Sequence, residues 1–291
     1  MPQEDWREQV RLLTMEEFKN LQGDYPYRRR LYRSMCPAGQ CMVETYADCV
    51  LGTLKIPGGS RTEKTGQFCG FYLRDNELLL IEDGQLFGAL LRKIEQNDCG
   101  AAGAGQILLL LFERLIANDM LYLGQQEELL SEMEEGLLKK IPERFHETII
   151  GYRRRFLTYH MYYEQLLALG EKMQLRTRQT QDAEELEGVS WQLYIDQVGR
   201  LHGYVEFLRD YLVQIRDLYQ SLIDVEQNKV MRMLTVVTTI FLPLSLIAGW
   251  YGMNFPYMPE FTYRKAYYVV LAVSVGIVAV EFVFFHKKKI L

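Results

Sequence analysis

The sequence predicts an α+β domain with a mixed sheet, followed by a very long helix that continues into a C-terminal hairpin of two membrane-spanning helices. Three observations predict this fold. Short segments rich in β-forming residues alternate with turn residues near the N-terminus. No proline interrupts the chain from Asp182 to Leu242. Two long apolar runs then follow, separated by a short polar loop.

The charge of the chain is divided unevenly. The 291 residues have a formal net charge of −5. From Asn228 onward there are seven Lys and Arg residues and two acids, whereas residues 1–227 contain 26 Lys and Arg residues and 36 acids. An acidic soluble part argues against nucleic acid as a partner. It is compatible with a cation partner and equally with simple solubility.

The N-terminal residues and the cysteines both indicate a cytosolic soluble part. The chain starts with polar residues and no apolar run, so we expect no secretory signal. An odd number of cysteines without a CxxC pair fits reduced thiols better than disulfides or a zinc site. The five cysteines are Cys36, Cys41, Cys49, Cys69 and Cys99.

Residues 1–140 form the predicted N-terminal α/β domain. Cys41–Ile56 and Gln67–Ile81 are rich in residues that favour strands, and Asp75-Asn76 interrupts the second segment as a turn. Gly84–Glu95 has the spacing of a helix. This mixture of strands and helices predicts a mixed sheet covered by helices.

Residues 141–232 are predicted to form long cytoplasmic helices, including a stalk. Ile141–Met173 can run as one helix, and Arg176–Gln181 has the composition of a polar turn. The next helix starts at Asp182, and if it continues to Tyr251 it spans 70 residues, about 105 Å. An apolar stripe in alternating steps of four and three indicates that it packs against other helices. The stripe consists of Tyr194, Val198, Leu201, Val205, Leu208, Leu212, Ile215, Tyr219 and Leu222.

The two apolar runs predict a membrane hairpin. Residues 233–251 are 19 in number, about 28 Å as a helix, and residues 266–285 form a second run of similar length. The loop 252–265 is too short to be a domain, so both ends of the hairpin lie on one side. Glu281 interrupts the second run. An acid in a span indicates a functional site by default, but near the end of the span it can also snorkel to the interface.

The flanking charges predict the orientation of the hairpin. Five Lys and Arg residues flank its two ends and two lie in its loop. The positive-inside rule therefore places the soluble part, both termini and the basic tail 286–291 in the cytoplasm of a multi-pass protein of the inner or plasma membrane. Aromatic residues crowd around the loop, as in an interfacial belt.

The loop carries a short motif. Tyr251-Gly252-Met253-Asn254-Phe255, followed by Met258-Pro259-Glu260, resembles the signature of the CorA magnesium transporters. The close resemblance covers residues 228–291, the long helices match in layout, and residues 1–140 match loosely. The Met-Pro-Glu segment resembles the magnesium branch more than the zinc-transporting ZntB branch. Three further segments resemble the family: 228–235, 241–244 and 287–289.

This resemblance implies a homopentameric ring in the lipid bilayer that conducts hydrated Mg²⁺ into the cytoplasm, and not an enzyme. Gly252, Met253 and Asn254 would form the selectivity motif. A ring of Asn254 carbonyls could accept hydrogen bonds from the waters that Mg²⁺ keeps. Gly252 would let the backbone turn, and Met253 more readily packs than ligates, because a thioether is a poor ligand for a hard cation.

The residues of the first run support a pore independently, because two helices alone cannot enclose one. Steps of three and four along the run give a face that is polar or small at some positions and apolar at others, without any charge. Polar rings can pass a hydrated ion, and apolar rings can close by dewetting. The alternative is that the small and hydroxyl residues simply pack helices together. The predicted pore-lining and gate residues are Asn228, Met231, Leu234, Thr235, Thr238, Leu242, Ser245 and Gly249.

Backward extension of the same register gives an acidic face on the stalk, with Asp210, Asp217 and Asp224 seven residues apart. Around a rotation axis such carboxylates would repel one another unless a cation lay between them. Asp217 also falls where the CorA family has a regulatory aspartate. The three aspartates are therefore candidate ligands of a regulatory Mg²⁺ that gates the ring. The alternative is a solvated helix face.

Two other functions remain open from the sequence. The same architecture could transport Co²⁺, Ni²⁺ or Zn²⁺. A membrane-anchored enzyme or sensor is a more remote alternative, because the soluble part has no GxSxG, Walker or HExxH motif. Its histidines are isolated in the sequence, which favours structural or surface roles: His146, His160, His202 and His286.

Overall fold

The computed structural model describes residues 6–35, 42–58, 67–96, 103–179, 185–253, 258–259 and 264–288. The chain divides into two compact units, Met1–Ile215 and Arg216–Leu291. In chain order the elements are the 3₁₀ turn η1 (Trp6–Glu8), β1 (Val10–Leu13), α1 (Met15–Asn20), α2 (Arg28–Ser34), β2 (Met42–Thr45), β3 (Cys49–Ile56), β4 (Gln67–Arg74), β5 (Glu77–Glu82), α3 (Leu86–Gln96), α4 (Ala104–Ile116), α5 (Asp119–Lys139), α6 (Phe145–Gln179), α7 (Glu185–Tyr251) and α8 (Ala266–Lys287).

The first unit contains a five-stranded mixed sheet in the order β1-β5-β4-β3-β2. β1 pairs with β5 in parallel, and the other three pairs are antiparallel. Each predicted strand segment folds as a hairpin: the first contains β2 and β3, and the second contains β4 and most of β5. The second hairpin turns at Asp75-Asn76, as expected, and Asp75 has a φ of 48°. Asp and Asn adopt this left-handed region more readily than other non-glycine residues.

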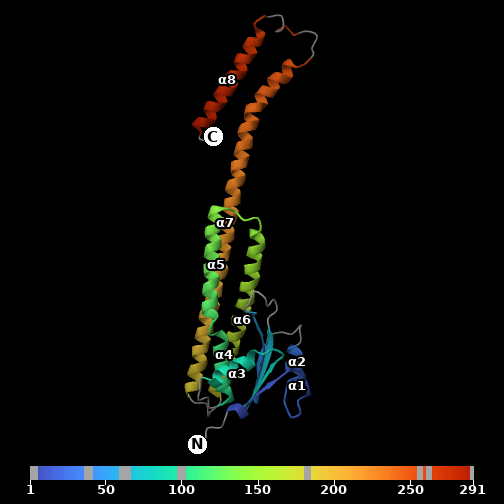
Figure 1. The fold of residues 1–291 in the computed structure, drawn as a ribbon, viewed down its shortest axis with the longest axis vertical. Helices are drawn as coiled ribbons and strands as arrows, with labels where there is room; N and C mark the ends of the chain where they lie inside the picture. The colour runs from blue at the N-terminus through green and yellow to red at the C-terminus, as the bar shows by residue number, and fades with distance from the viewer. Residues whose placement is uncertain are drawn as a thin grey trace. The chain divides into compact units, whose positions relative to one another are not determined.

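Helices cover both faces of this sheet (Figure 1). One face packs against α1 and α2. On the other face the ring of Phe71 meets the ring of Phe112 of α4 edge to face, with centroids 5.7 Å apart. At the β2 edge, Lys172 of α6 donates a hydrogen bond to the carbonyl of Val43. The central strands are therefore buried on both sides, which explains their nearly continuous apolar sequences. The core between the sheet and α1–α2 consists of Phe18, Leu31, Met35, Cys49, Leu51, Tyr72, Leu79 and Ile81.

The described cysteines belong to this sheet. Cys49 and Cys69 are buried free thiols. Burial raises the pKa of the Cys69 thiol to about 12, so it stays protonated at neutral pH. The other three cysteines lie outside the described residues.

A buried carboxylate fixes the start of α3. Glu82, at the end of β5, is 3% exposed. Its Oε2 accepts hydrogen bonds from the backbone N–H groups of Leu86 and Phe87 at 2.8 and 3.0 Å. Its Oε1 accepts another from Gly88 at 3.1 Å. Three N–H groups that would lack partners at a helix start are thus satisfied by one side chain.

The helices α5 and α7 run parallel within the first unit. The hydroxyl of Tyr204 donates a hydrogen bond to Glu127, and that of Tyr211 donates one to Glu134 at 2.5 Å. Both pairs are separated by 77 residues, so the offset between the helices stays constant over two turns. The ring of Phe207 stacks between the two tyrosines, with centroids 6.1 and 6.2 Å away.

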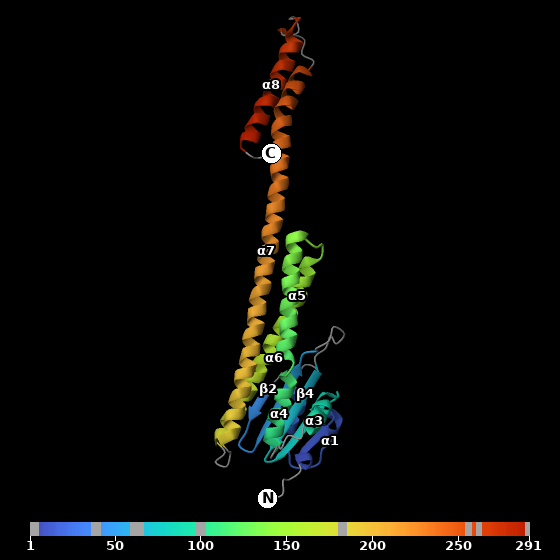
Figure 2. The same ribbon diagram turned by 60° about the vertical axis from the view of Figure 1, so that its left-hand side comes forward.

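The helix α6 runs antiparallel to α7 and lies beside it in both views (Figures 1 and 2). The side-chain amide of Gln174 donates to Gln192 at 2.7 Å. A Cβ placed on Gly170 would lie 2.7 Å from Ile195, so the helices approach closely there. The predicted apolar stripe of α7 is buried from Tyr194 to Ile215.

One expectation for these helices is wrong. Arg176–Gln181 was expected to be a turn, but α6 continues to Gln179. Arg and Gln are good helix formers, and the hydroxyl of Thr177 donates to the carbonyl of Met173 within the helix. The last two stripe residues, Tyr219 and Leu222, are half-buried in the single chain, and packing against another subunit stays a prediction for them.

The second unit contains the rest of α7, from Arg216, and α8. An apolar groove lies between these two segments, lined by Leu244, Ser274, Val275, Val278, Ala279 and Phe282. Most of the large apolar side chains of this unit are exposed in the single chain, among them Trp250 and Phe284 at 61% and 52%. A water-soluble protein would rarely leave so large an apolar surface uncovered.

Candidate cation pathway

The predicted pore-lining residues lie on one continuous helix, the C-terminal part of α7. All eight, from Asn228 to Gly249, are exposed in the single chain. These side chains are therefore free to contact another copy of the chain, lipid or a water-filled space. None of the eight is charged.

The threonines of this face have hydroxyl oxygens that can accept hydrogen bonds from outside the helix. The hydroxyl of Thr235 donates to the carbonyl of Met231 at 2.8 Å, and that of Thr238 donates to Leu234 at 2.9 Å. Because each proton is used within the helix, the lone pairs of the hydroxyl oxygens remain available. Such oxygens can accept hydrogen bonds from the waters of a hydrated cation.

The bulky apolar residues of the face are more than half exposed in the single chain. Met231, Leu234 and Leu242 are 60%, 54% and 73% exposed. Thr235 and Thr238 lie between Met231 and Leu234 on one side and Leu242 on the other, so a hydroxyl level separates two apolar levels of the face.

The backbone is close-packed where α7 ends. The N–H of Gly252 donates to the carbonyl of Ala248 at 2.9 Å, and a Cβ added to Gly252 would lie 2.9 Å from the same oxygen. Any larger residue would therefore displace the chain at this point. Met253 follows and is 47% exposed. Asn254 lies outside the described residues.

Both C-terminal helices are long and apolar enough to cross a membrane, judged by length and composition. They are Ser190–Tyr251 within α7 and Ala266–Lys287, the whole of α8. Only 6% of the most apolar stretch of each is buried. The core helix of a soluble protein would be mostly buried, so this finding favours a membrane environment.

The three aspartates of the predicted regulatory face are all exposed on α7. Asp217 accepts hydrogen bonds from the neighbouring Arg216 at 2.8 and 3.1 Å. Asp224 accepts one from Gln220 at 3.2 Å. Among the described residues, the hydrogen bonds of Asp217 and Asp224 thus involve only near neighbours on the same helix. Asp210 belongs to the first compact unit.

Glu281 of α8 is partly buried, and its Oε2 has no hydrogen-bond partner among the described residues. It lies two turns before the helix ends at Lys287.

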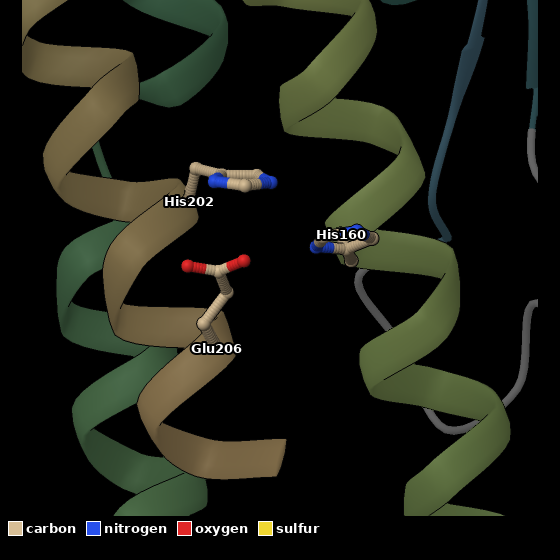
Figure 3. Close-up of side chains that lie close together, drawn as sticks. All are labelled: His160, His202 and Glu206. Atoms are coloured by element: carbon tan, nitrogen blue, oxygen red, sulfur yellow. The ribbon is translucent and has the colours of Figure 1, made fainter. Parts of the chain in front are cut away.

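Two of the histidines that are isolated in the sequence lie together in the structure. His160 of α6 and His202 of α7 stack, with ring centroids 4.6 Å apart and an interplanar angle of 30° (Figure 3). Glu206 lies one turn after His202. The signal in the sequence was the spacing of four between His202 and Glu206, which puts both on one side of a helix. The approach of His160, 42 residues earlier, has no such signal.

Comparison with known proteins assigns the family. The profile of the CorA-like Mg²⁺ transporter protein family matches residues 31–287. The cobalt/magnesium transport protein CorA of Thermotoga maritima is 49% identical over 85 residues, which cover 29% of this chain and 24% of that protein. The protein of the same name from Methanocaldococcus jannaschii is 27% identical over 227 residues, which cover 75% of this chain and 70% of that protein.

Solved structures agree in fold. The CorA magnesium transporter of M. jannaschii superposes with a TM-score of 0.76 at 24% identity, covering 94% of this chain and 87% of that one. The cytoplasmic domain of ZntB from Vibrio parahaemolyticus superposes with a TM-score of 0.56 at 10% identity, covering 71% and 82%. With the α+β unit, the long helix and the two apolar helices in place, the profile match over most of the sequence is decisive: this chain belongs to the CorA-like Mg²⁺ transporter protein family.

Proposed function

We propose that this chain forms a homopentameric channel that conducts hydrated Mg²⁺ across the plasma membrane into the cytoplasm. The observation that carries the proposal is the exposed, uncharged face of α7 that leads to Gly252-Met253-Asn254 in a chain of this family. The names of the relatives, which specify magnesium and cobalt transport, support the same ion class.

The number of membrane helices in one copy supports oligomerisation. One copy supplies two helices to the membrane, and two helices cannot enclose a water-filled path. In copies arranged around an axis, the face from Asn228 to Gly249 could line a water-filled pore and would then not contact lipid. The α8 helices would then form the outer ring, where the apolar run 266–280 is compatible with lipid.

The chemistry of the path suits an ion that keeps its water. Mg²⁺ dehydrates reluctantly, so a selective path should bind the waters rather than the bare ion. The hydroxyl oxygens of Thr235 and Thr238 and the side-chain carbonyls of Asn254 are neutral acceptors for those waters. Met231 and Leu242 would form apolar constrictions that close by dewetting when the helices approach the axis.

The membrane topology follows the distribution of charge. We place residues 233–251 and 266–285 in the bilayer and the loop 252–265 outside. The N-terminal domain 1–140, the long helices 141–232 and the tail 286–291 are then cytoplasmic, because basic residues flank that side.

Cytoplasmic Mg²⁺ would regulate the channel through the stalk. Asp210, Asp217 and Asp224 recur on one side of α7 and would face neighbouring copies. A divalent cation between copies would relieve their repulsion and favour the closed ring. It would have to compete with the Arg216–Asp217 contact, which is an exposed pair worth about 0–1 kcal/mol and therefore displaceable.

The ion preference can be tested by uptake into proteoliposomes that contain the purified protein and a metal-sensitive dye. Mg²⁺, Co²⁺, Ni²⁺ and Zn²⁺ are supplied in turn at equal concentration. We expect saturable Mg²⁺ entry and competition by Co²⁺. Entry of Zn²⁺ alone would contradict the magnesium assignment and indicate a zinc transporter. If none of the four ions entered, the membrane-anchored enzyme or sensor would be the favoured function.

A further inference from the structure

We propose that His160, His202 and Glu206 form a binding site for a borderline transition-metal ion of the Zn²⁺ type within each subunit, between α6 and α7. The site uses none of the residues of the conducting face and none of the three regulatory aspartates. All three residues belong to the first compact unit.

The three side chains converge from two helices. His202 and Glu206 extend from successive turns of α7 on the side that faces α6, and His160 extends from α6 toward them (Figure 3). One ligand atom of each residue lies within 4.8 Å of the others. Two ligands of one Zn²⁺ ion lie at most about 4.2 Å apart, because each bond is about 2.1 Å long. Small rotations of these side chains would therefore close the site.

Two ring nitrogens lack a partner. Nδ1 of His160 and Nε2 of His202 are buried, and neither has a hydrogen-bond partner among the described residues. Buried polar atoms in folded proteins are nearly always paired, so an unpaired one needs an explanation. Two such nitrogens on stacked imidazoles from different helices suggest a shared ligand. A metal ion accepts both lone pairs at once.

The surrounding contacts hold the two helices in register. The close approach of Gly170 to Ile195 and the Gln174–Gln192 hydrogen bond align α6 with α7 on one side of the histidine pair. The hydroxyl of Tyr204, two residues after His202, is anchored to Glu127 of α5. The histidines therefore meet because the helix backbones are already fixed. A site built on rigid helices loses little conformational freedom when it binds an ion.

The donor set selects the kind of ion. Imidazole nitrogen suits Zn²⁺, Ni²⁺ and Cu²⁺, whereas Mg²⁺ prefers oxygen ligands and retains its water. Two imidazoles and one carboxylate provide three ligands, which leaves the fourth position of a tetrahedral ion to water. We therefore expect this site not to bind Mg²⁺ at the concentrations that would saturate the aspartate sites. An ion bound here would join two helices and stabilise the soluble unit.

Calorimetric titration of the metal-stripped, detergent-solubilised full chain with ZnCl₂ tests the proposal. Excess Mg²⁺ is present throughout to occupy oxygen-ligand sites. We expect one Zn²⁺ per subunit and a higher unfolding temperature with Zn²⁺ than without it. His160→Phe and His202→Phe keep an aromatic ring in the stack but remove the ligand. Each should weaken Zn²⁺ binding at least about tenfold, since even second-shell losses at metal sites cost about 10–100-fold.

His146→Ala is the matched control, because His146 is an exposed histidine of the same helix α6. It should bind Zn²⁺ like the wild type. Co²⁺ serves as a spectroscopic probe, and its visible spectrum should indicate nitrogen and oxygen ligands without thiolate. Equal Zn²⁺ binding by wild type and both phenylalanine variants would overturn the proposal. So would a Co²⁺ spectrum with thiolate bands that both variants retain.

Discussion

Asp119, in the first turn of α5, accepts a hydrogen bond from the hydroxyl of Tyr163 on α6 over 3.0 Å. Burial raises the pKa of this carboxyl to about 6, although the hydrogen bond acts in the opposite direction. The ionised form is therefore held in a site that penalises it at neutral pH.

Replacement of Asp119 should change the pH dependence of stability. The carboxyl pKa is about 6 in the folded chain and about 3.9 in the unfolded chain, so the folded state binds the proton more tightly. This group therefore lowers the free energy of unfolding as pH rises from about 4 to about 6, and its cost is constant above that range. At pH 7.5 the free energy of unfolding of Asp119→Asn should therefore exceed that of wild type. We expect a difference of about 1–2 kcal/mol, because the variant also loses the favourable contact between the carboxylate and the helix dipole.

Denaturation of the detergent-solubilised protein at pH 4.5 and pH 7.5 measures this difference, which should shrink at the lower pH. Glu132→Gln, an exposed carboxylate-to-amide change on the same helix, should leave both values unchanged. A wild-type and Asp119→Asn pair that differ equally at both pH values would contradict the account.

The Glu82 cap should be a large contributor to the stability of the α/β unit. Glu82→Ala leaves the N–H groups of Leu86, Phe87 and Gly88 without their acceptor. Each unsatisfied buried group costs about 1–3 kcal/mol, and water will reach some of them, so we expect a total loss of about 3 kcal/mol. Thermal unfolding followed by circular dichroism checks it, with the exposed Glu16→Ala as control. A shift no larger than that of the control would mean that α3 does not depend on this cap.

The sequence predicted the elements that have a strong period or composition. The long helix, its buried stripe from Tyr194 to Ile215 and the two apolar helices follow from spacing and hydropathy alone. The turn at Asp75-Asn76 follows from residue type. These features depend on local sequence, so neighbouring residues are enough to specify them.

Features that depend on the register between distant helices could not be predicted. The Tyr211–Glu134 hydrogen bond joins residues 77 positions apart, and the His160–His202 stack joins residues 42 positions apart. Neither residue type nor spacing fixes which turn of one helix meets which turn of another. The end of α6 was also missed, because the polar residues 176–179 suit an exposed helix as well as a turn.

The apolar residues of the pore face should act as the gate. Met231→Ala and Leu242→Ala each remove a bulky exposed side chain from this face, which would widen and wet a constriction. We expect faster Mg²⁺ entry into proteoliposomes at high internal Mg²⁺, where wild type should be closed. Met233→Ala is the matched control, since Met233 is equally exposed but lies off the face. Wild-type flux in both gate variants would mean that these side chains face elsewhere.

The stalk aspartates should sense cytoplasmic Mg²⁺. Added Mg²⁺ should protect the wild-type protein from limited proteolysis, because it would draw the acidic faces of neighbouring copies together. Asp217→Ala should need several-fold more Mg²⁺ for the same protection. Glu226→Ala, an exposed acidic change off that face of α7, should behave as wild type. Superimposable Asp217→Ala and wild-type curves would remove Asp217 from the sensor.

The most direct test of the central claim is the initial rate of Mg²⁺ entry into proteoliposomes for wild type, Asn254→Ala and Thr262→Ala. Asn254→Ala removes the carbonyls that would bind the waters of the ion, while Thr262→Ala trims a residue of the same loop outside the motif. A loss of about 1.4 kcal/mol in ion binding already lowers occupancy tenfold at limiting Mg²⁺. We therefore predict that the rate of Asn254→Ala falls at least about tenfold while assembly and the Thr262→Ala rate are maintained. Equal rates in all three proteins would contradict the assignment of Gly252-Met253-Asn254 as the selective mouth of a magnesium channel.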